Sequence, residues 1–226
     1  MPSADIKANL QDVKKRIAAA CLRAGRSPSE VTLIGVTKTV DPAMIETAFK
    51  LGVCHFGENR VQEAAPKIGG LGHLSPHPTW HMIGHLQSNK LKSALEVFDV
   101  IQSVDSVELA EALDLKSQGR INGTPVLLQV NVSGEATKSG FSLKALDSGF
   151  SKIGCLHQIE IRGLMTIAPA SDDPEQVRPV FRKLRELRDF YHLQHLSMGM
   201  TGDFEVAIEE GATMVRLGRA IFGERI

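Results

Sequence analysis

The sequence predicts an α/β fold, a single TIM-type (β/α)₈ barrel preceded by one extra helix. Eight short apolar runs rich in β-branched residues alternate with segments of helical periodicity, without an intervening linker or repeat. The length of 226 residues fits the lower end of this fold, for which about 250 residues are typical. The G-x-G-x-x-G fingerprint of open dinucleotide-binding sheets is absent. We therefore expect residues 1–226 to form one domain, with its site at the carboxyl ends of the strands.

The first half of the chain supplies the extra helix and four strands. Residues 4–24 carry apolar side chains at helical spacing, with Ser3 as the cap and Gly25 as the end. The apolar run 31–37 predicts the first strand, and Asp41-Pro42 predicts the start of the next helix. The elements expected after these are a strand at 55–59, a loop at 69–78, a strand at 80–84, a helix at 87–95, a strand at 100–104 and a helix through Lys116 opened by a capping box of Asp105 and Glu108.

The second half continues the same alternation. A strand at 125–131 precedes a polar loop at 133–140 and a short helix capped by Ser142. The remaining expected elements are a strand at 159–166, a long helix starting at Asp173-Pro174, a strand at 195–199, a helix at 203–210 ended by Gly211, a strand at 214–218 and a final short helix.

Composition narrows the class of protein. Lys and Arg number 26 and Asp and Glu number 26, a balance that argues against nucleic acid or an anionic membrane as the main partner. No apolar run is long enough to span a bilayer, and the start of the chain lacks the core of a signal peptide. The three cysteines are odd in number and lack metal-ligand spacing. We expect a soluble cytoplasmic protein with reduced thiols and no metal site.

Lys38 stands at the carboxyl end of the first strand, where its side chain can project into a pocket above the sheet. A lysine forms imines with aldehydes when partial burial or a nearby cation removes its proton; an ordinary rim lysine is the alternative. Loops after the seventh and eighth strands form the usual phosphate site of this barrel. There Ser197 and Thr201 offer hydroxyl groups, and Gly218 allows close backbone approach. An imine-forming lysine facing a phosphate site suits pyridoxal 5′-phosphate.

Several segments carry a family resemblance. They are VTKT (36–39), FGENRVQE (56–63), WHMIGHLQSNK (80–90), GEATKSGF (134–141), GLMTI (163–167), LSMGMTGD (196–203) and VRLGRAIFG (215–223). The chain resembles the pyridoxal phosphate homeostasis proteins from about residue 31 to its end. This resemblance implies the fold type III barrel of the alanine racemase N-terminal domain, without the second, β-rich domain of that enzyme. It also implies a protein that carries pyridoxal phosphate for intracellular homeostasis.

The resemblance also assigns roles. Lys38 would hold the cofactor as a Schiff base, Ser197 would hold the phosphate with backbone N–H groups, and Arg216 would face the pyridine nitrogen. The expected cofactor-binding residues are Lys38, Asn59, Met82, Ser197, Thr201, Arg216, Gly218 and Arg219. An arginine always donates and keeps its charge, so it disfavours a protonated ring and weakens the cofactor as an electron sink. A rim salt bridge of Arg216 with Glu58 or Asp203 is the alternative.

Two other functions compete with a carrier: an amino-acid racemase or decarboxylase using the same imine, and a Schiff-base aldolase. Two-base racemisation needs a second acid/base, which in alanine racemase is a tyrosine from the domain that is absent here. Tyr191 is the only tyrosine and falls on the long helix, which favours a carrier without turnover. Aldolases of this kind place their lysine on a later strand. We expect a monomer whose partners are apoenzymes that use the cofactor, or a regulatory protein.

Other candidates have ordinary explanations. His81 is expected to be a packed, hydrogen-bonded histidine rather than a general base. Lys138 is expected to be solvated, the alternative being a second amine that transiently receives the aldehyde. Arg60 and Lys90 either solvate their helices or steer an anionic ligand. Asp173 is expected to cap a helix rather than bind a metal.

Overall fold

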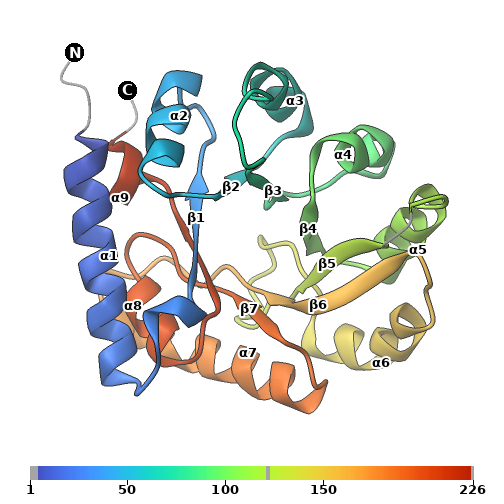
Figure 1. The fold of residues 1–226 in the computed structure, drawn as a ribbon. Helices are drawn as coiled ribbons and strands as arrows, with labels where there is room; N and C mark the ends of the chain where they lie inside the picture. Colours follow the sequence, from blue (N-terminus) through green and yellow to red (C-terminus); the bar gives the residue numbers. More distant parts are fainter. Residues whose placement is uncertain (1–4, 121–122, 225–226) are drawn as a thin grey trace.

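Eight parallel strands close into a barrel in the computed structural model, which describes residues 5–120 and 123–224 (Figure 1). Each strand pairs with its neighbours in chain order, and β1 closes the ring by pairing with β8, Ile34 opposite Arg216. The strands are β1 Thr32–Val36, β2 His55–Glu58, β3 Thr79–Met82, β4 Val100–Val104, β5 Thr124–Gln129, β6 Ile159–Met165, β7 His195–Ser197 and β8 Met214–Leu217. The predicted barrel is confirmed, with each strand within a few residues of its expected bounds.

Helices surround the barrel and alternate with the strands (Figure 1). The α-helices are α1 Ile6–Arg23, α2 Pro42–Lys50, α3 Val61–Gly70, α4 Leu91–Val97, α5 Val107–Lys116, α6 Leu143–Gly154, α7 Arg178–Phe190, α8 Phe204–Glu209 and α9 Arg219–Phe222. Short 3₁₀ segments are η1 Pro28–Glu30, η2 Ser88–Lys90 and η3 Pro174–Val177. The helix expected at 87–95 is therefore divided into η2 and α4, and the long helix expected from Asp173 begins as η3 before α7.

Local capping explains several helix starts. The Asp41 side chain accepts from Ala43 N, with Pro42 in the first turn of α2. Ser142 caps α6 and Asp173 caps η3, as predicted. The expected cap Ser3 lies outside the described residues; Asp5 accepts the N–H of Ala8 at the start of α1.

Two sequence predictions were wrong in this region. Ser106, rather than Asp105, caps α5, by accepting from Leu109 N. The Asp105 carboxylate instead lies 3.0 Å from His85 Nδ1. The sequence predicted no element at residues 60–68 and a loop from residue 69, whereas the structure has helix α3 there. The two glycines at 69–70 end α3 rather than begin the loop.

The extra helix α1 lies against the outside of the barrel beside α8 and α9, as Figure 1 shows. Both of those helices are short. Arg16 and Arg23 of α1 pair with Glu205 of α8, and Arg23 also pairs with Glu209. The Asn9 side chain donates to the carbonyl of Ile221 in α9. Helix α1 thus covers the place where the ring closes and the local helices are too short to do so alone.

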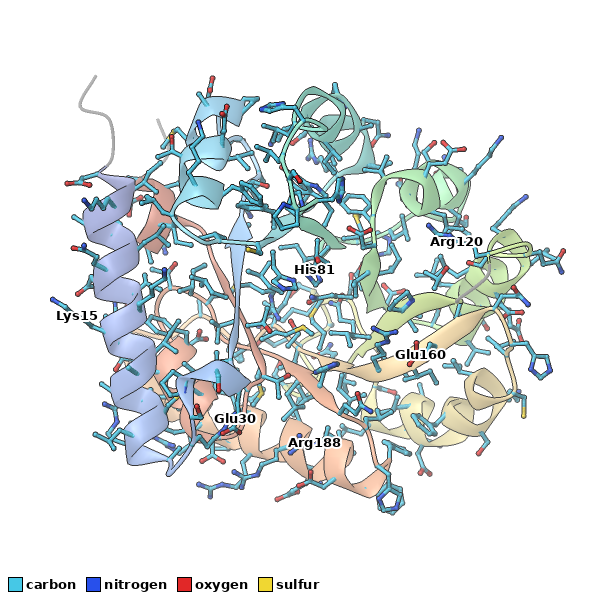
Figure 2. The ribbon with its side chains drawn as sticks, in the orientation of Figure 1. Lys15, Glu30, His81, Arg120, Glu160 and Arg188 are labelled. Carbon is cyan, nitrogen blue, oxygen red and sulfur yellow. The ribbon has the colours of Figure 1, made fainter. Side chains whose placement is uncertain are left out.

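The strands bury apolar side chains against the helices, but polar side chains lie inside the ring. Figure 2 shows His81 near the middle of the ring of strands, and this side chain is buried. Helices of the described residues are too short or too polar to cross a membrane.

The barrel wall leaves no room for a side chain at Gly163 of β6. A Cβ there would collide with the carbonyl of His195, its partner in the neighbouring strand. We predict that Gly163→Ala lowers the free energy of unfolding by about 3 kcal/mol or more, because backbone cannot move aside without breaking the ladder. Gly154→Ala, at the end of α6 where a Cβ meets nothing within 4 Å, should instead be neutral or stabilising by up to about 1 kcal/mol. Urea unfolding of both variants tests this, and equal stabilities would contradict it.

Candidate functional site

A cavity of about 710 Å³ opens at the carboxyl ends of the strands. Its lining comes from the ends of β1, β6, β7 and β8 and from the β5–α6 loop. Four basic side chains, Lys38, Lys138, Arg216 and Arg219, face two acidic ones, Asp203 and Glu224. An excess of positive charge in a concave site favours an anionic ligand.

The turn that carries Lys38 is held tightly. Val40 N donates to Thr37 O at 3.0 Å, which closes a turn with Lys38 and Thr39 as its central residues. Thr39 has φ 61°, a left-handed conformation that costs a threonine roughly 1–3 kcal/mol. The Lys67 ammonium also donates to Thr37 O, at 2.7 Å. Such strain persists only where the surroundings enforce it, and here it fixes the backbone from which Lys38 leaves.

A buried ion pair supports this turn. Lys67 Nζ lies 2.5 Å from Glu58 Oε1, and Thr37 Oγ1 donates to the same oxygen at 2.8 Å. The Glu58 side chain is fully buried, and its second oxygen has no hydrogen-bond partner among the described residues. Breaking a buried pair from one side leaves an uncompensated charge. The interaction therefore joins the ends of β1 and β2 to α3. Glu58 therefore pairs with Lys67 and does not form the salt bridge with Arg216 that was the alternative.

Arg216 lies in the barrel interior, 4% exposed. Its Nη1 donates to Ser197 Oγ at 2.6 Å and its Nη2 to Thr166 O at 2.7 Å. Both acceptors are neutral. Burial lowers the pKa of Arg216 to about 10, and the charge of Asp203 opposes that shift, so the guanidinium stays charged at neutral pH. Its hydrogen bonds go to a hydroxyl and a carbonyl rather than to a carboxylate, so the rim salt bridge considered above is not the arrangement found.

Ser197 is brought to Arg216 rather than to the cavity lining. Its hydroxyl is fully buried and donates to Gln102 Oε1 at 2.6 Å. Gln102 Nε2 lies 2.9 Å from His81 Nδ1, and His81 Nε2 lies 3.0 Å from His55 Nδ1. His81 is therefore the packed, hydrogen-bonded histidine that was predicted.

The loop after β7 is fixed by a glycine in a left-handed conformation and by two hydrogen bonds. Gly199 has φ 92°, and a Cβ there would crowd Phe204 and the next turn of α8. Its carbonyl accepts from Arg216 N at 3.0 Å. Asp203 Oδ1 accepts from Met200 N at 2.6 Å, which holds Thr201 at the rim of the cavity.

Gly218 and Arg219 line the same cavity beside Lys38. A Cβ at Gly218 would meet Val36 at 3.5 Å, an ordinary contact. Packing within the chain therefore does not require glycine at this position. Because glycine has no side chain, the backbone of Gly218 is exposed on the cavity wall.

Asn59 and Met82 lie in a neighbouring hollow of about 540 Å³, which Arg60, Gly84 and Lys90 also line. A Cβ at Gly84 would collide with the Asn59 backbone, so the β3 loop packs directly on Asn59. The structure thus gathers Lys38, Thr201, Arg216, Gly218 and Arg219 around one cavity. It places Asn59 and Met82 beside that cavity and Ser197 beneath it.

Other residues that shape the site were not identified from the sequence. Gln102 lies in the interior of a strand otherwise dominated by apolar residues, a pattern that signals an inward polar contact. Lys67 offered no such local signal, because it meets Glu58 only when α3 packs over β2. Lys138, weighed as a second amine, lines the same cavity as Lys38 and lies 3.2 Å from Glu135. Across the described residues, no group of three His, Cys, Asp or Glu side chains is placed to hold a metal ion.

Comparisons of the sequence and of the structure with known proteins find the same kind of relative. The family model for the N-terminal domain of alanine racemase matches residues 4–226. The pyridoxal phosphate homeostasis protein of Aquifex aeolicus is 45% identical over 222 residues, covering 96% of each chain. The protein of that name from Escherichia coli K12 is 40% identical over 227 residues, covering 98% of this chain and 97% of its own. The solved structure of PipY from Synechococcus elongatus, with PLP bound, is 40% identical, with a TM-score of 0.81 over 93% of this chain and all of its own.

The buried histidine makes stability depend on pH. Burial, and secondarily the charge of His55, lower the pKa of His81 from 6.5 to about 3. The unfolded chain therefore binds one more proton than the folded one between these values, so stability is full above pH 6.5 and falls as the pH drops. We predict that His81→Gln reduces the slope of unfolding free energy against pH near pH 5 by about 1.4 kcal/mol per unit.

Urea unfolding at several pH values measures this slope. His157→Gln, at an exposed position, is the matched control and should leave the slope unchanged. An unaltered slope in His81→Gln would contradict the burial of a neutral imidazole.

Proposed function

Because this chain belongs to the family of pyridoxal phosphate homeostasis proteins, we propose that it binds pyridoxal 5′-phosphate and buffers or delivers it inside the cell. One observation carries the proposal. The cavity is lined by a lysine that follows the end of β1 and by a buried arginine on the neighbouring strand β8, whose hydrogen-bond acceptors are neutral. A buried charge without an ion pair is costly, and an anionic ligand with an acceptor nitrogen would offset that cost.

Each residue then has a role in binding. Lys38 holds the cofactor through a Schiff base, with its backbone fixed by the Thr37–Val40 turn. Thr201, Gly218 and Arg219 hold the phosphate with a hydroxyl group, exposed backbone and a positive charge. This division differs from the expectation for Ser197, whose hydroxyl is bound to Arg216 and Gln102.

The remaining expected residues act from beside the cavity. Ser197 supports the ring-facing Arg216, and Asn59 and Met82 bound the ring from the neighbouring hollow. Pyridoxal phosphate supplies an aldehyde for imine formation and a pyridine ring that withdraws electrons. These residues fit such a group: an amine, an anion-binding rim and a donor for the ring nitrogen are all present.

We propose that the protein carries the cofactor without catalytic turnover. Arg216 donates to the ring nitrogen and disfavours its protonation, so the ring stabilises a carbanion poorly. Tyr191 stacks on Phe150, ring centroids 4.0 Å apart, at the end of α7. It therefore lies away from the cavity and is not placed to act as a second base.

We further propose that the chain acts as one cytoplasmic, monomeric domain that passes the cofactor to apoenzymes or a regulatory protein. Cys21, Cys54 and Cys155 are all free thiols, which suits a reducing compartment. The extra helix α1 is paired with α8 and α9, and its buried apolar side chains pack into the core of the same chain.

Lys38→Ala tests the covalent attachment. Loss of the imine should reduce the pyridoxal phosphate retained after gel filtration by about tenfold or more, because a covalent bond is replaced by contacts alone. Borohydride reduction of the wild-type protein followed by peptide mapping should place the adduct on Lys38. Lys138→Ala, which removes the other cavity lysine, is the matched control and should keep the adduct. Adduct on Lys138 alone, or none at all, would overturn the assignment.

Arg216→Gln tests the ring-facing donor. Loss of a charged hydrogen bond should speed cofactor release by about tenfold to a hundredfold. Release is measured by dialysis against buffer. Arg188→Gln in α7, where Arg188 pairs with Asp189 and does not line the cavity, is the control and should release the cofactor at the wild-type rate. Unchanged release from Arg216→Gln would argue against its role, and sustained amino-acid racemisation or decarboxylation that Lys38→Ala abolishes would favour an enzyme.

A further inference from the structure

Five polar side chains form a continuous string across the inside of the barrel, which we call the lumen string: Arg216, Ser197, Gln102, His81 and His55. Successive hydrogen bonds measure 2.6, 2.6, 2.9 and 3.0 Å. The string runs from β8 through β7, β4 and β3 to β2. It therefore connects the cavity with side chains on the opposite wall of the barrel.

The atoms that meet along the string give each hydrogen bond its direction. Arginine has only donors, so Ser197 Oγ accepts from Arg216. The Gln102 oxygen Oε1 faces Ser197 and can only accept, so the Ser197 hydroxyl donates to it, and the Gln102 NH₂ group faces His81 Nδ1. Its second amide proton points to Met214 Sδ at 3.7 Å.

The far end of the string is neutral. His81 Nδ1 accepts from Gln102, so the imidazole proton is on Nε2 and is donated to His55 Nδ1. Burial lowers the pKa of His81 to about 3 and also lowers the pKa of His55, so this direction does not reverse near neutral pH. None of the groups behind Arg216 in the string neutralises its charge.

We propose that Gln102, backed by His81, is a positioning residue that holds the Arg216 guanidinium toward the ring nitrogen of bound pyridoxal phosphate with its charge undiminished. This inference rests on the proposed function. Without the Gln102 amide, the Ser197 hydroxyl has no fixed direction. Arg216 Nη1 then loses an oriented acceptor, while Nη2 keeps Thr166 O. The guanidinium would rotate about that remaining contact.

A double-mutant cycle tests action through Arg216. Gln102→Met keeps length and volume but removes both hydrogen bonds to the string. The readouts on protein loaded with pyridoxal 5′-phosphate are the rate of cofactor release and the pH midpoint of its visible absorption band. We expect about threefold to tenfold faster release and a shifted midpoint. In an Arg216→Gln background the same change should have less than about a twofold effect, because the group it positions is gone.

Ser103→Ala is the matched control, since Ser103 is the next residue of β4 and is fully buried, and its hydroxyl has no hydrogen-bond partner within residues 5–120 and 123–224. It should leave both readouts at wild-type values. Equal effects of Gln102→Met in the two backgrounds, or an equal effect of Ser103→Ala, would assign the change to packing and overturn the inference.

A measurement on the wild-type protein does not depend on the variants folding. Nitrogen-15 NMR of the unloaded protein at pH 7 should show His81 neutral with its proton on Nε2; the opposite tautomer would overturn the inference. If the wild-type protein shows no visible band with pyridoxal phosphate, the proposed function fails. If it does and the cycle is additive, only the role of Gln102 fails.

Discussion

The buried guanidinium of Arg216 is the interaction on which the rest of the site depends. A barrel interior of this kind is ordinarily packed with branched apolar side chains. Here a permanent cation lies among neutral acceptors, Ser197 and the Thr166 carbonyl. The Arg216 guanidinium, which only donates, begins a string of hydrogen bonds through the Ser197 hydroxyl, the Gln102 amide and the imidazoles of His81 and His55. The polar side chains inside the barrel therefore hold the charged guanidinium of Arg216 at the bottom of the cavity.

A second interaction fixes the turn that carries Lys38. The buried pair of Lys67 and Glu58 joins α3 to the ends of β1 and β2, and Lys67 also binds the carbonyl of Thr37. Thr39 in the same turn has a strained, left-handed conformation. Amine and guanidinium are consequently presented from adjacent, hydrogen-bonded strands, β1 and β8. A rigid spacing between these two groups suits retention of a cofactor better than a moving active site does.

Local signals in the sequence predicted most of the fold, and non-local contacts account for what was missed. The strand–helix alternation and the caps Asp41 and Ser142 depend on neighbouring residues, and they were correct. Helix α3 was missed, and its sequence carries weak local signals, since Pro66 lies inside it, two glycines end it and no side chain caps its start. Lys38 and Arg216 were found at strand ends by fold and family resemblance. The Ser197 hydroxyl donates to Gln102, which is 95 residues away in the sequence. This contact depends on how strands far apart in the sequence meet inside the barrel, and no local pattern encodes it.

The most direct test of the central claim is nitrogen-15 NMR of the protein loaded with pyridoxal phosphate labelled at the ring nitrogen. A charged Arg216 that donates to this atom predicts an unprotonated pyridine nitrogen throughout the pH range 6 to 9. A pyridinium signal at pH 7 in a fully loaded sample would contradict the account, because it would require an anionic partner where the structure has a cation.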